Sequence, residues 1–370
     1  MIKVAYVLGA LDRGGTETLL LDTVKQQRID CVVVHRKQGA LWQEFCQTQT
    51  PLYHFPTGPL LYISYLFRLR KLVRKEHITI IHAQLPFDGF LAYWACWGIR
   101  VQLVLSFHGY DLGYGQLARW LVRFIIKRTS LNIYVSQHLR AYYQQAYALV
   151  KETAQQVVYN GINFNKFDEI SSTSIRQELT IPSQALLLGS VGNFVSVRDP
   201  LTICRGLAAL KKSGADVHCL FVGACNPADP SLYEECTAYC DRHGLSSSVH
   251  FLGSRSDVSA ILHELDAFVY ASDHDSFGIA VVEAMAVGLP VFVNDWAVMQ
   301  EITENGKRAT LYKTKDIDDF TVKILHFIQE KTLYKEAAAK NAARTRNTYS
   351  IEQHIDALKA QYRSIMNTNG

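Results

Sequence analysis

The sequence predicts an α/β protein with two domains, each built around a doubly wound parallel sheet. Short apolar runs rich in β-branched residues recur along the chain, and helix-like stretches separate several of them, an alternation typical of parallel sheets. The series of runs starts at residue 2 and starts afresh at residue 185, which indicates two sheets. A chain of 370 residues, 48% of them hydrophobic, is long enough for two hydrophobic cores.

The expected elements follow in order along the chain. The first set of strands is residues 2–10, 31–36, 78–84, 101–109, 132–136 and 157–161, and the second set is residues 185–194, 218–224, 248–253, 267–272 and 291–295. A helix is expected at residues 17–28, because Leu20, Leu21 and Val24 share one side. Residues 349–366 have the pattern of one amphipathic helix.

Polar and turn-forming residues gather at residues 160–173, NGINFNKFDEISST, and mark the expected domain boundary. The first domain is accordingly placed at residues 1–165 and the second at residues 166–349. Ser350 is suited to be the N-cap of the terminal helix that follows.

Composition and charge narrow the class of protein. The 8 cysteines include no C-x-x-C pair and the chain shows no apolar leader, so we expect reduced thiols in a cytosolic protein. No apolar run reaches the roughly 18 residues of a membrane-spanning helix. Residues 1–150 carry 17 Lys and Arg against 8 Asp and Glu, a net charge of +9, whereas the remainder carries 21 against 26, a net charge of −5. This asymmetry indicates that one half meets an anionic surface.

The stretch VLGALDRGGTET, residues 7–18, begins like a phosphate-binding loop but has Gly15 where such a loop needs lysine. Gly14 and Gly15 precede a predicted helix, whose N-terminal N–H groups attract anions. A nucleotide triphosphatase is disfavoured without the lysine. A tight turn that uses glycine for geometry alone is an equally good interpretation.

The most distinctive segment is YASDHDSFGIAVVEAMAVGLPVFVND, residues 270–295. It predicts a strand, a polar loop, a helix of about three turns and a second strand. The N–H groups of residues 277–279 are then expected to be free for an anion. Asp275 and Glu283 can accept hydrogen bonds from the hydroxyls of a sugar or ribose. The alternative is that Asp275 or Ser276 caps the helix while Glu283 lies on a solvated face.

Two further strand ends carry candidate residues. In SVGNFVSVRDP, Arg198 offers a forked cation suited to a diphosphate, with Asn193 nearby in the loop; an exposed arginine paired with an acid is the alternative. In LSFHGYDL, His108 follows a strand and would face the crevice of an open sheet, although a turn histidine explains it equally well. His82 is placed similarly. Neither H-E-x-x-H nor G-x-S-x-G occurs.

Two segments suit the surface of an anionic membrane. Residues 60–75 combine a broad apolar side with five basic residues, and residues 116–128 repeat this design with Arg119, Arg123 and Lys127 in one stripe. The alternative is that both are ordinary helices that bury their apolar sides against the sheet. We expect peripheral, salt-sensitive binding to anionic membranes.

In this order along the chain, the segments resemble the retaining glycosyltransferases of family 4, which have the GT-B architecture. The resemblance covers nearly the whole chain and rests on GGTE, FHGYD, YVS, NGIN, VGNF with the following arginine, LFVG, VHFLGSRSDV and SDHDSFGIAVVEAMAVGLPV. It implies two Rossmann-like domains that face across a cleft, with the acceptor mainly against the first and a nucleotide-sugar mainly against the second. It also implies that a terminal helix, residues 350–370, crosses back to the first domain, and that residues near 161–175 are the hinge for closure.

The resemblance assigns roles to individual residues. Arg198 stands where the family usually has a diphosphate-binding lysine, and Asn193 where arginine is frequent. His108 matches a histidine near the transferred sugar, and Glu283 matches the carboxylate that usually binds ribose. Asp275 is the first acid of the E-x7-E pattern of the family, with a side chain one methylene shorter than glutamate.

The implied catalytic set is His108, Asp275 and Arg198, and the implied donor-binding set is Gly14, Gly15, Asn193, Arg198, Ser276, Phe277, Gly278, Ile279 and Glu283. The glycine loop would lie near donor phosphates that the second domain chiefly holds, so it can lack a lysine. Neither a metal nor another cofactor is expected, and no nucleic-acid partner.

The resemblance implies a retaining hexosyltransferase that moves a sugar from a nucleotide-sugar to an acceptor hydroxyl. The expected acceptor is a lipid-linked or surface-polysaccharide intermediate, and the expected place is the cytoplasm, at the inner face of a membrane. Two alternatives are a nucleotide-sugar epimerase of the same architecture and a nucleotide-sugar-binding protein without activity.

Overall fold

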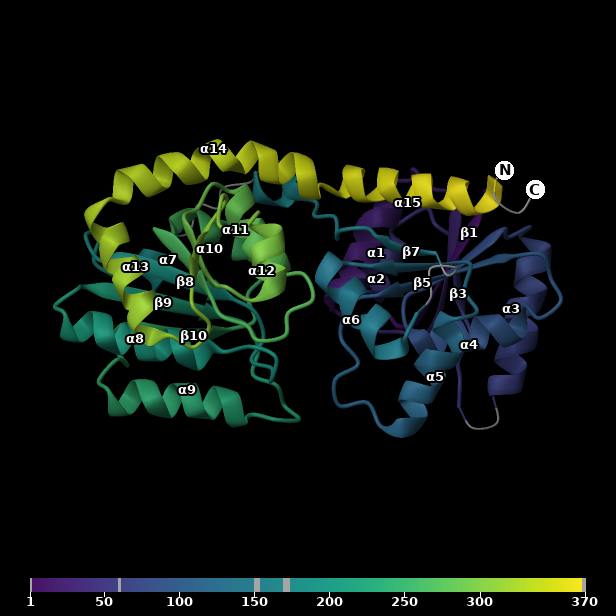
Figure 1. Cartoon of the computed structure of the whole chain (residues 1–370), viewed down its shortest axis with the longest axis horizontal. Coiled ribbons are helices and arrows are strands. Elements are labelled where there is room, and N and C mark those ends of the chain that lie inside the picture. Colours follow the sequence, from purple (N-terminus) through teal and green to yellow (C-terminus); the bar gives the residue numbers. More distant parts are fainter. Residues whose placement is uncertain (1, 59–60, 150–153, 169–173, 368–370) are drawn as a thin grey trace. The chain divides into compact units, whose positions relative to one another are not determined.

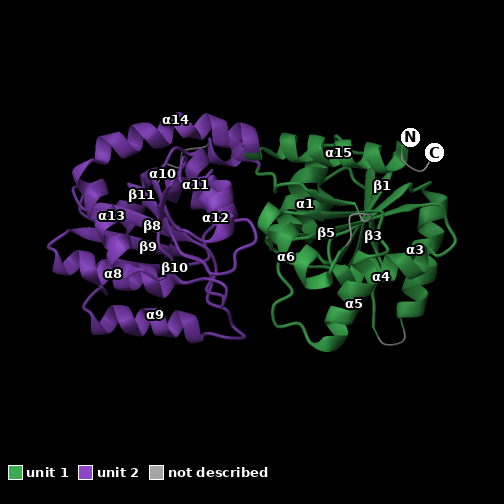
Figure 2. Cartoon of the chain, in the orientation of Figure 1, with its two compact units in different colours: residues 1–162, 349–370 green, residues 163–348 purple. Residues whose placement is uncertain are grey.

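The computed structural model describes residues 2–58, 61–149, 154–168 and 174–367 (Figure 1). The chain forms two compact units, residues 1–162 with 349–370 and residues 163–348 (Figure 2). Residues 169–173 of the predicted hinge, residue 60 of the first predicted membrane segment and residues 368–370 of the terminal helix lie outside the described residues.

The first unit contains a seven-stranded parallel sheet in the order β3-β2-β1-β4-β5-β6-β7. Its strands are β1 (Val4–Ala10), β2 (Cys31–Lys37), β3 (Leu52–His54), β4 (Ile80–Ala83), β5 (Gln102–Phe107), β6 (Leu131–Tyr134) and β7 (Gln155–Val157). Its helices are α1 (Gly15–Lys25), α2 (Trp42–Cys46), α3 (Tyr62–Lys75), α4 (Pro86–Ala95), α5 (Gln116–Ile126), α6 (Gln137–Tyr147) and α15 (Ile351–Asn367).

The second unit contains a six-stranded parallel sheet in the order β10-β9-β8-β11-β12-β13. Its strands are β8 (Leu186–Val191), β9 (Val217–Val222), β10 (Val249–Gly253), β11 (Ala267–Tyr270), β12 (Val291–Asn294) and β13 (Thr310–Tyr312). Its helices are the 3-10 turn η1 (Phe164–Phe167), α7 (Ile175–Glu178), α8 (Pro200–Lys212), α9 (Ser231–Arg242), α10 (Val258–Glu264), α11 (Ile279–Ala286), α12 (Ala297–Ile302), α13 (Ile317–Gln329) and α14 (Lys331–Tyr349).

Both sheets confirm the predicted doubly wound α/β architecture. The central strands are buried along their whole length, as in β4, β6, β11 and β12, because helices cover both faces of a parallel sheet. Such strands read as continuous apolar runs rather than as alternating patterns. Each sheet therefore has its own core, one for each unit.

The terminal helix α15 belongs to the first unit (Figure 2). Ile355, Leu358 and Tyr362 along one of its sides are buried. The Ser350 hydroxyl accepts a hydrogen bond from the Gln353 amide at 3.3 Å, as expected of an N-cap. The backbone at Ser350 also forms a parallel bridge with Ile162.

The two predicted membrane segments form helices α3 and α5, and each divides its apolar residues between core and surface. In α3, Leu69 and Val73 are buried, so part of the apolar side predicted from the sequence packs inside the unit. The exposed apolar residues of α3 are instead Ile63 and Phe67. In α5, the predicted Arg119, Arg123 and Lys127 stripe is exposed, and so are Leu117 and Trp120.

Close packing of α8 against α13 yields a test of the fold. A Cβ at Gly206 would overlap the ring of Phe320, which is fully buried. We expect Gly206→Ala to destabilise the second unit by about 1–2 kcal/mol, the cost of overpacking less the gain in helix propensity. Calorimetry should show a melting temperature lower by about 2–8 °C. Arg205→Ala, an exposed change on α8, is the control, and equal melting of both variants would contradict this packing.

Candidate active site

The carboxyl ends of β8 and β11 define the candidate site of the second unit. These two strands are neighbours in the middle of the sheet, and the chain turns outward from them in opposite directions, which leaves a crevice at the strand ends. The loop after β8 and the loop after β11 are joined. The Ser272 hydroxyl donates to the Val197 carbonyl at 2.8 Å, and Arg198 forms an antiparallel bridge with Ser272. The two loops therefore form one framework.

Arg198 is held by three neighbours in this framework. Its Nη1 donates to the Val191 carbonyl at 3.2 Å, and its guanidinium lies 4.8 Å from the centroid of the Tyr270 ring. The guanidinium also lies over Gly192, where any Cβ would overlap it and where φ is +147°. The half-buried cation is thus fixed at the end of the sheet by contacts that leave little freedom.

Asn193 connects the same loop to the loop after β9. Its side-chain oxygen accepts a hydrogen bond from the Ala224 amide at 2.9 Å, and Phe194 forms a bridge with Cys225. The exposed Asn193 side chain therefore shapes the neighbouring backbone. Its neutral amide adds no charge next to Arg198.

Asp275 organises the turn that leads into α11. Its Oδ1 accepts from the amides of Phe277 at 3.2 Å and Gly278 at 3.0 Å, and its Oδ2 accepts from the Tyr270 hydroxyl. The expectation that the amides of residues 277–279 are free for an anion is therefore wrong for Phe277 and Gly278, because a carboxylate of the same turn already takes them. The alternative, in which Asp275 or Ser276 caps the helix, is not borne out either. Gly278 is the N-cap of α11 and has no side-chain cap hydrogen bond, and the two amides that Asp275 holds precede the first helical residue, Ile279.

The other predicted donor residues lie close along the chain to this turn. Gly278 has φ of +85°, a left-handed conformation that favours glycine, and precedes α11, which begins at Ile279. Phe277 is buried, and Ser276 is half-buried. Glu283 lies within α11 and is half-buried, so it does not lie on a fully solvated face.

Sequence reasoning missed Tyr270, the last residue of β11. Its ring faces the Arg198 guanidinium and its hydroxyl donates to Asp275, so one side chain connects two of the three predicted catalytic residues. A signal was present, because a tyrosine at the end of an apolar strand carries a polar group that needs a partner when buried.

The predicted glycine loop of the first unit lies at the end of β1. Gly14 is the N-cap of α1 and has an extended conformation with no side-chain cap. The Glu17 carboxylate lies so near that a Cβ at Gly14 would overlap it. Burial raises the pKa of Glu17. An anion at Gly14 and Gly15 would raise this pKa further, because it would repel the ionised carboxylate.

His108 follows β5 and lies beside two other histidines of the first unit. Its Nε2 is 3.1 Å from the Gln84 side-chain oxygen, so the ring donates there. Nδ1 of His354, on α15, is 2.7 Å from the Tyr159 carbonyl. His108, His82 and His354 line a small cavity of about 20 Å³.

Desolvation keeps these three rings neutral. It lowers the pKa of His82 to about 3 and the pKa values of His108 and His354 to about 4, and a charge on one ring would disfavour charge on another. His82 is also held on both sides, with Nδ1 at 2.6 Å from the Tyr362 hydroxyl and Nε2 at 2.7 Å from the Ser106 hydroxyl. At neutral pH His108 can therefore orient a hydroxyl by hydrogen bonding but is a weak base.

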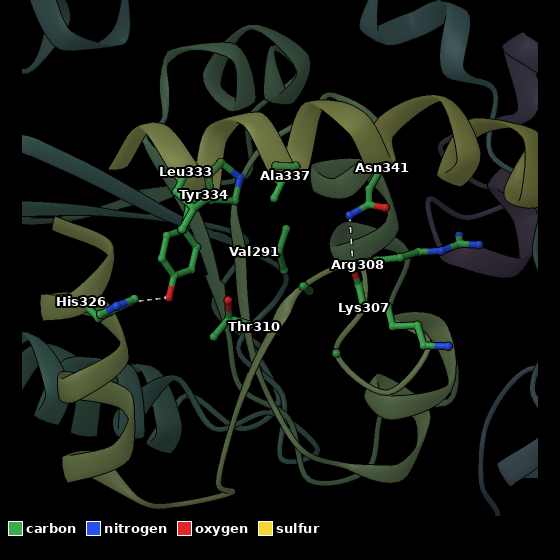
Figure 3. Close-up of a pocket in the computed structure, with 13 residues that line it drawn as sticks. Val291, Lys307, Arg308, Thr310, His326, Leu333, Tyr334, Ala337 and Asn341 are labelled. Atoms are coloured by element: carbon green, nitrogen blue, oxygen red, sulfur yellow. Dashed lines mark hydrogen bonds between the residues drawn. The ribbon is translucent and has the colours of Figure 1, made fainter. Parts of the chain in front are cut away.

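A larger cavity of about 250 Å³ lies elsewhere in the second unit (Figure 3). It is lined by residues at the starts of β12 and β13 and by α13 and α14, with Tyr334 bonded to His326 at 2.9 Å. These are the amino ends of the strands, whereas Arg198 lies at the carboxyl ends. The cavity is therefore at the opposite end of the strands from Arg198. No residue predicted from the sequence lines it.

Within the described ranges, no three His, Cys, Asp or Glu side chains gather closely enough to hold a metal ion. Among the helices that the structure describes, none combines the length and apolar character needed to cross a membrane.

Comparison with known proteins agrees with this geometry. The model of Glycosyltransferase Family 4 matches residues 13–166, and the model of Glycosyl transferases group 1 matches residues 171–346. The N-acetyl-alpha-D-glucosaminyl L-malate synthase of Bacillus anthracis is 22% identical over 88% of this chain and 83% of its own length. The lipopolysaccharide core biosynthesis mannosyltransferase LpsB of Rhizobium meliloti (strain 1021) is 23% identical over 66% of this chain and 68% of its own.

Solved structures share the whole fold. Anabaena HepE, solved in complex with UDP-glucose, matches with a TM-score of 0.86 at 21% identity, covering 98% of this chain and 100% of its own. A glycosyltransferase from Rickettsia africae ESF-5 matches with a TM-score of 0.86 at 17% identity, covering 99% and 98%. The two-sheet fold is therefore that of the GT-B glycosyltransferases. Within this class, the chain belongs to the family-4-like glycosyltransferases.

The neutral histidines lead to a prediction about pH. Each of the three has a folded pKa below its unfolded value near 6.5, so the unfolded state binds more protons in acid. Their stabilising contribution is complete above pH 6.5 and is lost as the pH falls towards 4, at up to about 1.4 kcal/mol per pH unit for each ring. We expect His108→Gln to reduce the pH dependence of the free energy of unfolding by the equivalent of one proton. Urea unfolding at several pH values, followed by tryptophan fluorescence, measures this. Exposed His243→Gln is the control, and an unchanged slope for His108→Gln would contradict a neutral His108.

The Asp275 turn leads to a prediction about stability. Asp275→Ala leaves the Phe277 and Gly278 amides and the buried Tyr270 hydroxyl without this acceptor, so we expect a loss of about 1–3 kcal/mol in the second unit. Asp275→Asn keeps one acceptor oxygen and should lose less. Thermal unfolding of both variants measures the difference, and equal stability of Asp275→Ala and the unmodified chain would exclude the turn as a stabilising element.

Proposed function

We propose that the chain transfers a hexosyl group from a nucleotide-sugar to an acceptor hydroxyl with retention of anomeric configuration. The observation that carries this proposal is the fixed Arg198 guanidinium at the end of β8, connected through Tyr270 to the Asp275 carboxylate. A cation held for a diphosphate and an acceptor for sugar hydroxyls then occupy one framework in the second unit.

The chemistry follows from where charge develops. The bond between the anomeric carbon and the donor phosphate oxygen breaks, and its electron pair leaves with the diphosphate. Arg198 stabilises this charge because its guanidinium is already in place and needs no reorganisation. The dipole of α11 adds a smaller favourable term near its N-terminus.

The acceptor side needs no strong protein base. In the proposed front-face reaction the acceptor oxygen bonds to the anomeric carbon on the face that the diphosphate leaves, and its proton passes to a donor phosphate oxygen. A neutral His108 suits this reaction, because it can orient a hydroxyl without competing for the proton. Glu283 is proposed to bind the ribose hydroxyls of the donor.

The two units contribute unequally to donor binding in this proposal. Gly14 lies beside the Glu17 carboxyl, and a carboxylate there repels a phosphate bound to this loop. The diphosphate is therefore held chiefly by Arg198. This is why the loop at residues 9–15 works without a lysine.

The proposed acceptor is a lipid-linked or surface-polysaccharide intermediate, used at the inner face of a membrane. The net charge of +9 over residues 1–150 supports this, and so does the similarity to LpsB, a lipopolysaccharide core biosynthesis mannosyltransferase.

A thermal-shift screen of UDP-, GDP- and ADP-sugars identifies the donor, because a ligand that binds only the folded state raises its melting temperature.

Transfer activity of Arg198 variants tests the proposal. We expect Arg198→Ala to lower kcat/KM by about 2–4 kcal/mol in barrier terms, or roughly 30- to 1000-fold, and Arg198→Lys to recover part of the loss. Arg205→Ala, an exposed arginine on α8, is the matched control. Near-normal rates for Arg198→Ala would remove this residue from the phosphate site.

The same assay separates the alternatives. Product analysis by NMR should show the anomeric configuration of the donor in the product, and inversion would refute the retaining mechanism. Conversion of donor alone to an epimer would instead identify an epimerase. Tight nucleotide-sugar binding with no transfer to a panel of lipid-linked acceptors would identify a binding protein without activity.

A further inference from the structure

Four aromatic side chains form a continuous row on the surface of the first unit. Trp97 stacks on Trp94 with 5.2 Å between ring centroids, Trp94 stacks on Phe124 at 6.1 Å, and Phe124 stacks on Trp120 at 5.6 Å. Trp97 is 59% exposed and Trp120 is 55% exposed. We call this row the aromatic ladder; it joins the end of α4 to α5.

Further apolar side chains are exposed on the helices that carry or adjoin the aromatic ladder. Helix α3 packs beside α4, and α4 packs beside α5, so the three helices form one layer (Figure 1). Leu117 of α5 is 79% exposed, and Ile63 and Phe67 of α3 are also exposed. Scattered apolar residues are normal on a protein surface, but a contiguous aromatic group of this size marks an interaction surface.

Two arginines hold the aromatic ladder rigid. Arg70 of α3 donates to the carbonyls of Ala95 at 3.1 Å and Trp97 at 2.8 Å, which fixes the end of α4. The Arg128 guanidinium lies 3.9 Å from the centroid of the Phe124 ring and donates to the Phe124 carbonyl at 3.0 Å. Because the rings are already ordered, an interaction with them costs little side-chain entropy.

The charges around the aromatic ladder select the partner. Helices α3 and α5 contain no acidic residue, and their basic residues are Arg68, Arg70, Lys71, Arg74, Lys75, Arg119 and Arg123, followed directly by Lys127 and Arg128. A second copy of the chain placed on this surface would bring like charges together. An anionic phospholipid bilayer offers negative headgroups for the cations and an apolar interior for the rings.

We propose that the aromatic ladder inserts into the boundary between headgroups and acyl chains of an anionic membrane, with α4 and α5 lying along the surface. Tryptophan favours this depth because its ring is apolar and its N–H is polar. Insertion of the ladder would bring the first unit against the membrane. Helix α5 follows β5 in the chain, and His108 lies at the carboxyl end of β5. This deepens the proposed function, since it gives the route by which a lipid-linked acceptor reaches the first unit.

Vesicle binding by the full chain tests the proposal without any transfer assay. The probe is vesicles of phosphatidylglycerol and phosphatidylcholine, with pure phosphatidylcholine as the lipid control. We expect cosedimentation with the anionic vesicles only, weakening as salt rises, and quenching of tryptophan fluorescence by lipids brominated high on the acyl chain. The double variant Trp97→Ser, Trp120→Ser should bind at least tenfold more weakly.

Matched variants separate the contributions. Leu333→Ser removes an exposed apolar residue of the second unit and should bind as the unmodified chain does. Lys71→Glu with Arg123→Glu should weaken binding to anionic vesicles while leaving the melting temperature unchanged, since both side chains are exposed. Circular dichroism confirms that each variant is folded.

Several outcomes would overturn the proposal. Absence of cosedimentation at low salt would do so, and so would undiminished binding by the double tryptophan variant. Self-association that the same variant abolishes, with no vesicle binding, would assign the surface to a second copy instead. If the unmodified chain binds vesicles but transfers no sugar, the proposed function is refuted and the membrane proposal is not.

Discussion

The close approach of the Arg198 guanidinium to the backbone at Gly192 is the constraint on which the candidate site depends. A side chain larger than hydrogen at Gly192 would occupy the space of the guanidinium. Once the arginine lies there, its ring contact with Tyr270 and the bridge to Ser272 connect the loops after β8 and β11. The Tyr270 hydroxyl in turn donates to Asp275, which holds the turn before α11. The site is therefore rigid before any ligand arrives.

The fold could be predicted from the sequence because a parallel strand buried on both faces appears as a continuous run of apolar residues. Residues 2–10, 185–194 and 267–272 each contain a strand, and the restart at residue 185 separates the strands of the two sheets. The short edge strands β3 (Leu52–His54) and β13 (Thr310–Tyr312) were not predicted, because three residues are too few to form an apolar run.

The candidate site was predicted in part. Arg198 and Asp275 fall in one framework, in agreement with the family resemblance, which assigns both to the site. Occupation of the Phe277 and Gly278 amides was not foreseen, because a carboxylate two or three residues earlier competes for them through a turn that only coordinates reveal. The histidine group of the first unit escaped prediction for another reason. It needs His354, which is about 250 residues from His108 along the chain.

The terminal helix α15 has a consequence for the order in which the protein is made. The second unit, residues 163–348, is one uninterrupted segment, whereas the first unit needs residues 349–370 to complete its core. Tyr362 bonds to both Tyr6 and His82, so a ribosome must release the chain beyond Tyr362 before these partners can meet. During synthesis the sheet of the first unit therefore remains uncovered where α15 later packs. The second unit is translated later than this sheet but has all its residues available first.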